Sequence, residues 1–199
     1  CEKRTEVNDK ILLNNEKNSL VYLYSKKEVK APLYLELSYC YEGEADTLLL
    51  GFFAENEPGS VPECHGKMLG GCSKYYSKGS IAVGFDPHYS RKGLVVITED
   101  GKCEVRMTKI DLTSGCHNLK LLATHEIDLW VDEYGPFTFN FSKRKGSVYL
   151  VANSGDSTAR VEVNFLRVYE GEVTIVDKVE KAGFSEVEIK DFRGIAYGK

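Results

Sequence analysis

Residues 79–98, which read GSIAVGFDPHYSRKGLVVIT, contain two short apolar runs on either side of a polar turn. Short runs rich in Val and Ile, bounded by Gly, Pro and Ser, are typical of β-strands. Asp86 ends the first run, so it is either a ligand at a functional site or the polar stop of a buried strand. The stretch predicts two strands joined by a loop.

The same pattern recurs along all 199 residues. No segment keeps an apolar period of 3.6 residues for three turns, so no helix is predicted. We expect an all-β antiparallel sandwich or jelly roll, with an N-terminal arm over 1–19 and one sandwich domain over 20–199. The further predicted strands are 20–24, 33–40, 47–53, 103–108, 119–124, 137–142, 147–152, 159–169, 172–176 and 186–189.

Composition excludes several classes of partner. The formal net charge is −4 with Lys and Glu interleaved, which argues against nucleic acid and anionic membranes as partners. No apolar run approaches the roughly 18 residues of a membrane-spanning helix. The chain contains no glutamine and is rich in Lys and Glu, which predicts a thermophilic source.

Six cysteines, an even number, predict disulfides. None lies in a C-x-x-C motif, and the four histidines are not spaced with them as in zinc sites, so no metal is expected. Disulfides in turn predict either export or a hyperthermophilic source, and we prefer export. Fifteen connectivities are open, and we expect the local pairs Cys64–Cys72 and Cys103–Cys116, with Cys1 joined to Cys40. Cys1 is alternatively a lipid attachment site.

Four short motifs resemble the concanavalin A-like sandwich of L-type lectins and glucanases. They are the strand Leu50–Phe53, the loop prolines Pro58 and Pro62, the turn Leu69–Gly71 and the strand Val83–Asp86. The resemblance covers residues 47–98 and implies a two-sheet fold with a sugar and metal site in the lectins. Gly84 stands where the family has a metal-binding Glu, and Leu48 stands where it has a sugar-binding Asp. We therefore expect no metal site, and Asp86 is interpreted as a strand-end residue.

The stretch HEIDLWVDE, residues 125–133, invites comparison with the catalytic strand of laminarinase-type glycosidases. Glu126 and Asp128 fit the first two acidic positions, but Trp130 or Val131 stands at the third. Asp132 is six residues from Glu126, about 20 Å along an extended strand, whereas a retaining mechanism needs about 5.5 Å. The sequence predicts no catalytic residue and no cofactor. Glu42, Glu44 and Asp46 carry the carboxylates that a calcium site at a turn would need, but a solvated acidic turn is the preferred interpretation.

The preferred functional hypothesis is a non-catalytic structural or adhesive protein of the cell surface. The chain would assemble into a homopolymer by β-strand addition, with Ile11 and Leu13 of the arm filling sockets on a neighbour. The alternative is a free lectin-like module, and a glycoside hydrolase is the third choice.

Glycan contacts would use exposed aromatic side chains as stacking platforms. The candidates are Tyr75, Tyr76, Tyr89 and Trp130. Asn140 begins an Asn-Phe-Ser glycosylation sequon, although the same residues also fit a strand.

Overall fold

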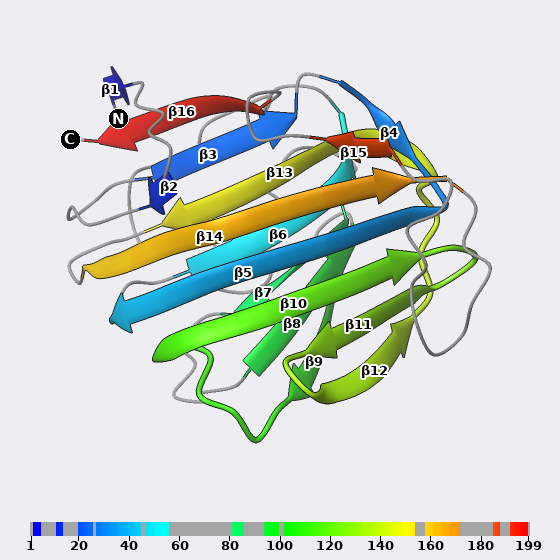
Figure 1. The fold of residues 1–199 in the computed structure, drawn as a ribbon, viewed down its shortest axis with the longest axis horizontal. Coiled ribbons are helices and arrows are strands. Elements are labelled where there is room, and N and C mark those ends of the chain that lie inside the picture. The colour runs from blue at the N-terminus through cyan, green and yellow to red at the C-terminus, as the bar shows by residue number, and fades with distance from the viewer. Residues whose placement is uncertain are drawn as a thin grey trace.

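Every regular element that the structure describes is a β-strand, as predicted (Figure 1). The structure is a computed structural model. It describes residues 2–4, 11–13, 20–25, 27–44, 47–55, 81–85, 94–99, 102–153, 158–171, 185–187 and 192–198. In these ranges there is no helix, and so none that is long and apolar enough to cross a membrane.

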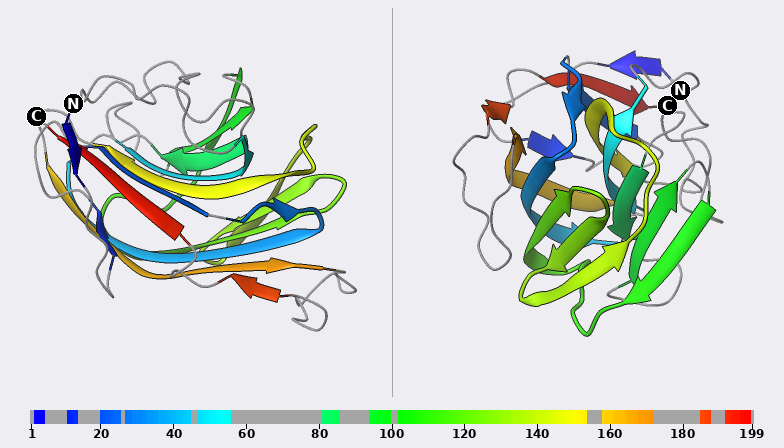
Figure 2. Two further views of the ribbon diagram at one scale, coloured as in Figure 1. Left: turned by 90° about the horizontal axis from the view of Figure 1, so that it is seen from above. Right: turned by 90° about the vertical axis from the view of Figure 1, so that its right-hand side faces the viewer.

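The strands form two antiparallel sheets packed as a curved sandwich (Figure 2). The nine-stranded sheet has the order β1-β16-β3-β13-β6-β7-β8-β9, with β4 paired to β13. Its strands are β1 (Glu2–Arg4), β3 (Leu20–Ser25), β4 (Val29–Lys30), β6 (Thr47–Ala54), β7 (Ile81–Phe85), β8 (Leu94–Glu99), β9 (Lys102–Met107), β13 (Lys145–Asn153) and β16 (Phe192–Gly198).

The seven-stranded sheet has the order β12-β11-β10-β5-β14-β15, with β2 paired to β14. Its strands are β2 (Ile11–Leu13), β5 (Leu33–Gly43), β10 (Gly115–Ala123), β11 (Ile127–Val131), β12 (Tyr134–Phe139), β14 (Ala159–Glu170) and β15 (Ser185–Val187). The long strands β5, β10 and β14 run side by side at its centre.

The core lies between the sheets and follows from strand periodicity. Alternate residues of a strand point to opposite faces, so the apolar residues of β5 and β14 form one wall. Leu35, Leu37 and Tyr39 of β5 are fully buried against the opposite sheet. Glu36 and Arg167 occupy the outward positions and lie directly opposite each other.

The region of the lectin resemblance forms three adjacent strands, β6, β7 and β8, of the nine-stranded sheet. Leu48 faces the core and is buried, so the carboxylate of an acid at this position would be out of contact with water. At Gly84, an added Cβ would lie only 2.2 Å from the Leu48 carbonyl oxygen. The close approach of β6 leaves no room for the metal-binding Glu of the resemblance.

Two of the three cysteine pairs expected from the sequence are wrong. Cys40 of β5 is bonded to Cys116 of β10, with sulfurs 1.98 Å apart, because these residues are directly opposite in the register of the two strands. This bond excludes both Cys103–Cys116 and Cys1–Cys40. Cys103 is also disulfide-bonded. The expected pair Cys64–Cys72 lies outside the described residues.

The N-terminal arm pairs with its own chain where it is described. Glu2–Arg4 pairs with β16, and Ile11 and Leu13 are opposite Val163 and Val161 of β14. Strand donation by Ile11 and Leu13 to a neighbour therefore requires exchange of this short pairing, and it stays a prediction.

Candidate functional site

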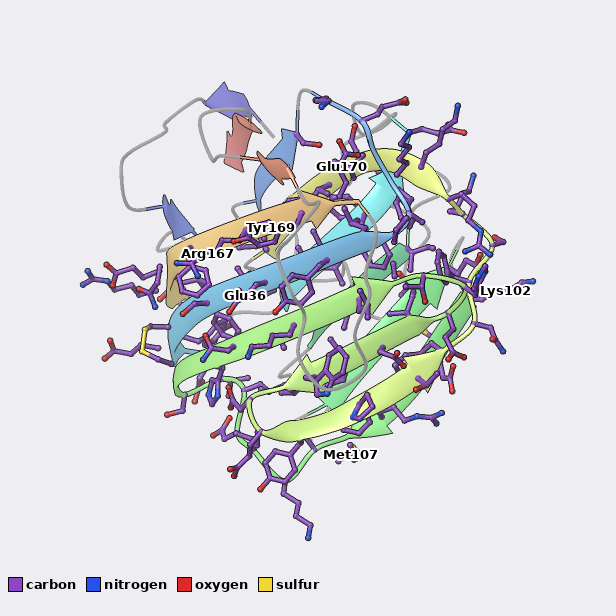
Figure 3. The ribbon with its side chains drawn as sticks, turned by 45° about the vertical axis from the view of Figure 1, so that its right-hand side comes forward. Glu36, Lys102, Met107, Arg167, Tyr169 and Glu170 are labelled. Atoms are coloured by element: carbon purple, nitrogen blue, oxygen red, sulfur yellow. A yellow bond between two sulfur atoms is a disulfide. The ribbon has the colours of Figure 1, made fainter. Side chains whose placement is uncertain are left out.

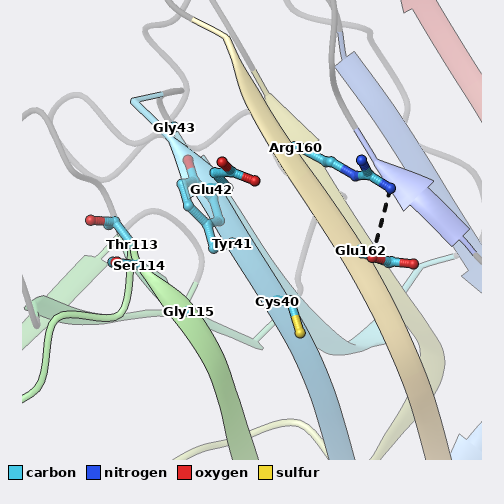
Figure 4. A pocket seen from close by; sticks show the side chains of 9 residues that line it. All are labelled: Cys40, Tyr41, Glu42, Gly43, Thr113, Ser114, Gly115, Arg160 and Glu162. Atoms are coloured by element: carbon cyan, nitrogen blue, oxygen red, sulfur yellow. Dashed lines mark ion pairs between the residues drawn. The ribbon is translucent and has the colours of Figure 1, made fainter.

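A cavity of about 610 Å³ lies where β5 ends and β14 begins, beside the Cys40–Cys116 disulfide (Figure 4). Its walls come from three segments: the end of β5, the loop before β10 and the start of β14. Besides Cys40 and Tyr41, the lining residues are Glu42, Gly43, Thr113, Ser114, Gly115, Arg160 and Glu162. The volume lies in the range of small-ligand sites in proteins.

Charged groups on two neighbouring strands give the cavity its chemistry. Arg160 lies directly opposite Glu42 in the β5–β14 register, and its guanidinium is 4.0 Å from the Glu162 carboxylate. The Arg160 side chain is 63 % exposed, so its donors can reach a ligand. Carboxylates accept hydrogen bonds, a guanidinium donates up to five, and the Ser114 hydroxyl does both. Such a set matches a neutral ligand with many hydroxyl groups.

Two glycines shape the ends of this cavity. Gly43 has a φ of +123°, and a Cβ there would lie 2.5 Å from the Thr158 carbonyl oxygen. That close approach lets the Glu44 amide donate a hydrogen bond of 3.1 Å to the same oxygen. Gly115 has a φ of +79°, and a Cβ there would meet nothing within 4 Å, so this residue borders open space.

The loop before β10 is held by hydrogen bonds from the core residue Tyr39 and within the loop itself. The Tyr39 hydroxyl donates to the Leu112 carbonyl oxygen at 3.1 Å. Asp111 Oδ1 accepts from the Thr113 amide at 3.0 Å and from the Thr113 hydroxyl at 2.7 Å. Burial, reinforced by the nearby Asp132 charge, raises the pKa of the Tyr39 hydroxyl well above its usual range, which keeps this donor protonated.

A His–Asp pair, of which His117 is buried and Asp132 is partly exposed, fixes the same loop from the other side. His117 Nδ1 lies 2.7 Å from Asp132 Oδ2, and His117 Nε2 lies 2.7 Å from the Ser114 carbonyl oxygen. Because both partners are acceptors, both contacts are hydrogen bonds when each ring nitrogen carries hydrogen. Asp132 Oδ1 also accepts from the Asn118 amide at 2.7 Å. The pair thus links the β11–β12 turn to the cavity wall at Ser114.

The acidic residues of the stretch 125–133 lie in three different surroundings. Glu126 lies exposed in the turn before β11, Asp128 accepts a hydrogen bond from Thr138, and Asp132 faces His117. Our expectation that Asp132 continues an extended strand is wrong, because β11 ends at Val131 and Asp132 has a φ of +51° in the turn.

The tentative glycan-contacting residues do not line the cavity where they are described. Trp130 is half-buried on β11, directly opposite Lys120 of β10. Asn140 is exposed just after β12. Tyr75, Tyr76 and Tyr89, like Asp86, lie outside the described residues, and among those that are described no cluster of three potential metal ligands occurs.

Sequence reasoning missed the residues that build the cavity. Arg160 and Glu162 belong to a strand with alternating charges, and only the β5–β14 register brings them to Glu42. The acidic turn at Glu42 was noticed as a possible cation site, but its neighbour is the cation Arg160. His117 and Asp132 are fifteen residues apart and gave no local signal.

Comparison with solved structures gives the fold. The carbohydrate recognition domain of Emp46p in its potassium-bound form aligns with a TM-score of 0.60 and 15% identity, over 86% of this chain and 88% of that one. The exoplasmic/lumenal domain of VIP36, bound to Ca²⁺ and Man3GlcNAc, aligns with a TM-score of 0.56 and 10% identity, over 89% and 91%. The fold is the concanavalin A-like β-sandwich.

A third solved structure, from work on endo-acting O-glycanases of human gut microbiota, aligns with a TM-score of 0.50 and 12% identity, over 75% of this chain and 78% of that one. No protein-family model matches the chain, and no curated protein matches it in sequence. The concanavalin A-like sandwich is thus shared with lectins and with a protein from a study of glycan-degrading enzymes, and the fold alone does not choose between binding and hydrolysis.

Proposed function

We propose that the protein is a non-catalytic carbohydrate-binding β-sandwich and that it binds glycans in the cavity between β5, β14 and the loop before β10. The observation that carries the proposal is the lining of this cavity. Glu42 and Glu162 supply acceptors, Arg160 supplies donors, and Ser114 supplies a hydroxyl. Specific recognition of a sugar needs such a convergent set, because each hydroxyl both donates and accepts.

The site differs in position from the stretch of the lectin resemblance. That stretch, residues 47–98, forms strands of the nine-stranded sheet, whereas the cavity belongs to the seven-stranded sheet. Gly84 and Leu48 offer no side-chain oxygen at the positions that resemble the lectin site. Binding would therefore need no metal ion.

The absence of catalysis is part of the proposal. Glu42 and Glu162 lie on β5 and β14, and Arg160 stands opposite Glu42 and next to Glu162. Hydrolysis by paired acids requires two carboxyl groups that flank the scissile bond, whereas here the Arg160 side chain lies beside both acids. Glu126 and Asp128 lie outside the cavity.

Replacing Arg160 with Ala is expected to weaken glycan binding by about tenfold or more, because hydrogen bonds to a charged group contribute about 1.5–3 kcal/mol. Isothermal titration with mannose oligosaccharides, mucin O-glycans and β-glucans measures the loss. The matched control is Arg167→Ala, since Arg167 faces Glu36 on the same two strands but lies outside the cavity (Figure 3). Binding unchanged in Arg160→Ala, or no binding of any glycan by the wild type, contradicts the proposed site.

The same glycans should remain intact after long incubation with the wild-type protein. Release of reducing ends that disappears in Glu126→Gln would show that the chain is a hydrolase. Hydrolysis lost in Glu42→Gln or Glu162→Gln would place the catalytic acid in the cavity instead. Either result would replace the binding proposal with an enzymatic one.

A second candidate function is assembly at the cell surface after export. The disulfide is consistent with export, because such bonds persist in oxidising compartments. The observation that bears on assembly is the short pairing of Ile11–Leu13 with β14, which is only three residues long. The same register would serve an arm exchanged between neighbouring copies.

Deleting residues 1–19 is expected to leave a folded chain that no longer forms polymers, because the sandwich core is built from later strands. Analytical ultracentrifugation and circular dichroism of the two forms check the result. If the shortened chain unfolds, the arm belongs to the fold of its own chain. If the wild type forms no polymer, arm exchange is not its function.

A further inference from the structure

Strand β9 is an edge of the nine-stranded sheet with an unusual surface. Among the described strands only β8 pairs with it, and all six of its residues, Lys102–Met107, are exposed. Figure 3 labels Lys102 and Met107 at its two ends. An exposed edge strand carries a row of backbone donors and acceptors that can pair with another chain.

The two faces of β9 differ in chemistry. Val105 and Met107 are 46% and 51% exposed, and they are the large hydrophobic residues that stand out as exposed in the described part of the chain. Val105 lies opposite Val96 of β8, on the face turned away from the core. On the core side of the strand, Glu104 and Arg106 form an ion pair at the open end of the sandwich.

Arg106 is also held in place at this end. Its guanidinium carbon lies 5.4 Å from the centroid of the Phe139 ring, and its side chain is still 45 % exposed. Glu104 is 48 % exposed. Both charges are therefore available to a partner that extends the sheet.

We propose that β9 pairs with β9 of a second copy of this chain, antiparallel about a two-fold axis at Val105, so that the two nine-stranded sheets become one continuous sheet. In this register Val105 lies opposite Val105 of the second copy, and Glu104 lies opposite Arg106 of the second copy. Because the two-fold axis repeats the Glu104–Arg106 pair, the dimer contains two cross-strand pairs of opposite charge. Cys103 lies opposite Met107, on the same face as Val105.

Two alternative symmetric registers conflict with the same side chains. An axis at Glu104 would place two glutamates face to face and Lys102 opposite Arg106. An axis at Arg106 would place two arginines face to face. Like charges directly opposite each other destabilise a strand pair. An axis at Cys103 would also set opposite charges face to face, Lys102 and Glu104, but it pairs only three residues of β9, whereas the axis at Val105 pairs the five residues Cys103–Met107. The Val105 register thus combines opposite charges with the longer pairing, whereas the charges that protect edge strands in monomers normally repel a second copy.

Single charge reversals test this pairing. Glu104→Arg places arginine opposite arginine at two points of the dimer, and Arg106→Glu places glutamate opposite glutamate. Sedimentation velocity should show the wild type moving from a mass of 22.3 kDa toward twice that value as concentration rises. Each variant should dimerise about tenfold or more weakly, and the control Arg167→Glu, which changes the Arg167–Glu36 pair of β14 and β5 outside the cavity, should dimerise as the wild type does.

Mixing the two variants gives the decisive result. In a heterodimer, the two basic side chains of the Glu104→Arg chain lie opposite the two acidic side chains of the Arg106→Glu chain. Association should therefore return, although neither chain regains its own ion pair. A mixture that stays monomeric, or single variants that dimerise as the wild type does, would overturn the proposal. So would a wild type that stays monomeric at the highest concentration it tolerates.

Hydrogen exchange of the wild-type chain tests the same pairing without any substitution, in case a variant does not fold. Exchange at backbone amides of 103–107 should slow as concentration rises, because alternate amides gain partners in the second copy. Dimers without this protection would overturn the proposal. The β9 dimer should also survive deletion of residues 1–19, which separates it from arm exchange, and it makes no use of the glycan cavity.

Discussion

Replacing Cys40 and Cys116 together with Ala is expected to lower the free energy of unfolding by up to about 4 kcal/mol, because the bond closes a loop with a sequence separation of 76 residues. For a protein of this size such a loss corresponds to a fall in the melting temperature of roughly 10 °C. Thermal unfolding of the variant and the wild type without reductant measures it. Mass spectrometry of unreduced peptides should find residues 40 and 116 in one linked fragment.

The control for this experiment is Glu162→Gln. Glu162 lies directly opposite Cys40 on β14 and is part of the same surface, but it is not needed to close the loop. The Glu162→Gln variant should have an unfolding free energy within about 0.5 kcal/mol of the wild type, as at ordinary surface sites. Equal melting temperatures for the cysteine variant and the wild type would show that the bond does not stabilise the fold.

The sandwich could be predicted because the apolar pattern that specifies each strand lies within that strand. Ile81–Phe85 and Ala159–Glu170 alternate or cluster apolar residues within the strand itself, and the predicted ranges agree with the observed strands to within a few residues. The short strand Ile127–Val131 was instead interpreted as part of an acidic motif. Its buried residues alternate with Asp128 and Trp130, as in a strand. This two-residue period covers only five residues, and polar residues on both sides make the whole stretch look acidic.

The disulfide pairing could not be predicted, because it depends on which distant strands become neighbours. Cys40 and Cys116 both occupy outward positions of their strands, and only the register of β5 and β10 makes them partners. Spacing along the chain favoured Cys103 with Cys116. In the structure Cys103 belongs to β9, in the other sheet.

The candidate site was hidden for the same reason. Glu42, Ser114 and Arg160 come from three segments that are far apart in the sequence, and none of them belongs to a recognisable motif. The turn at Asp132 carried only a weak signal, since aspartate tolerates positive φ but the following residue is Glu rather than Gly. A histidine and an aspartate fifteen residues apart become a pair only after the strands are aligned.

Replacing Asp132 with Ala is expected to lower the free energy of unfolding by about 3 kcal/mol, because it leaves the buried His117 ring and the Asn118 amide without their acceptor. Urea unfolding measures this loss. The same change frees the Ser114 carbonyl from a fixed partner, so glycan affinity should fall as well, although Asp132 does not line the cavity. Asp132→Asn should have a smaller effect, since an amide oxygen can still accept one of the two hydrogen bonds.

The matched control for this change is Asp128→Ala in the same hairpin. Asp128 also accepts a hydrogen bond, from the Thr138 hydroxyl at 2.7 Å, but on the outer face of the sheet where water can replace it. Its loss should cost less than about 1 kcal/mol and leave glycan affinity unchanged. Equal effects of the two alanines would show that Asp132 acts only as a surface turn residue. A strongly destabilised Asp132→Ala variant that binds glycans normally once folded would instead separate the His–Asp pair from the cavity, and the loop before β10 would then need another support.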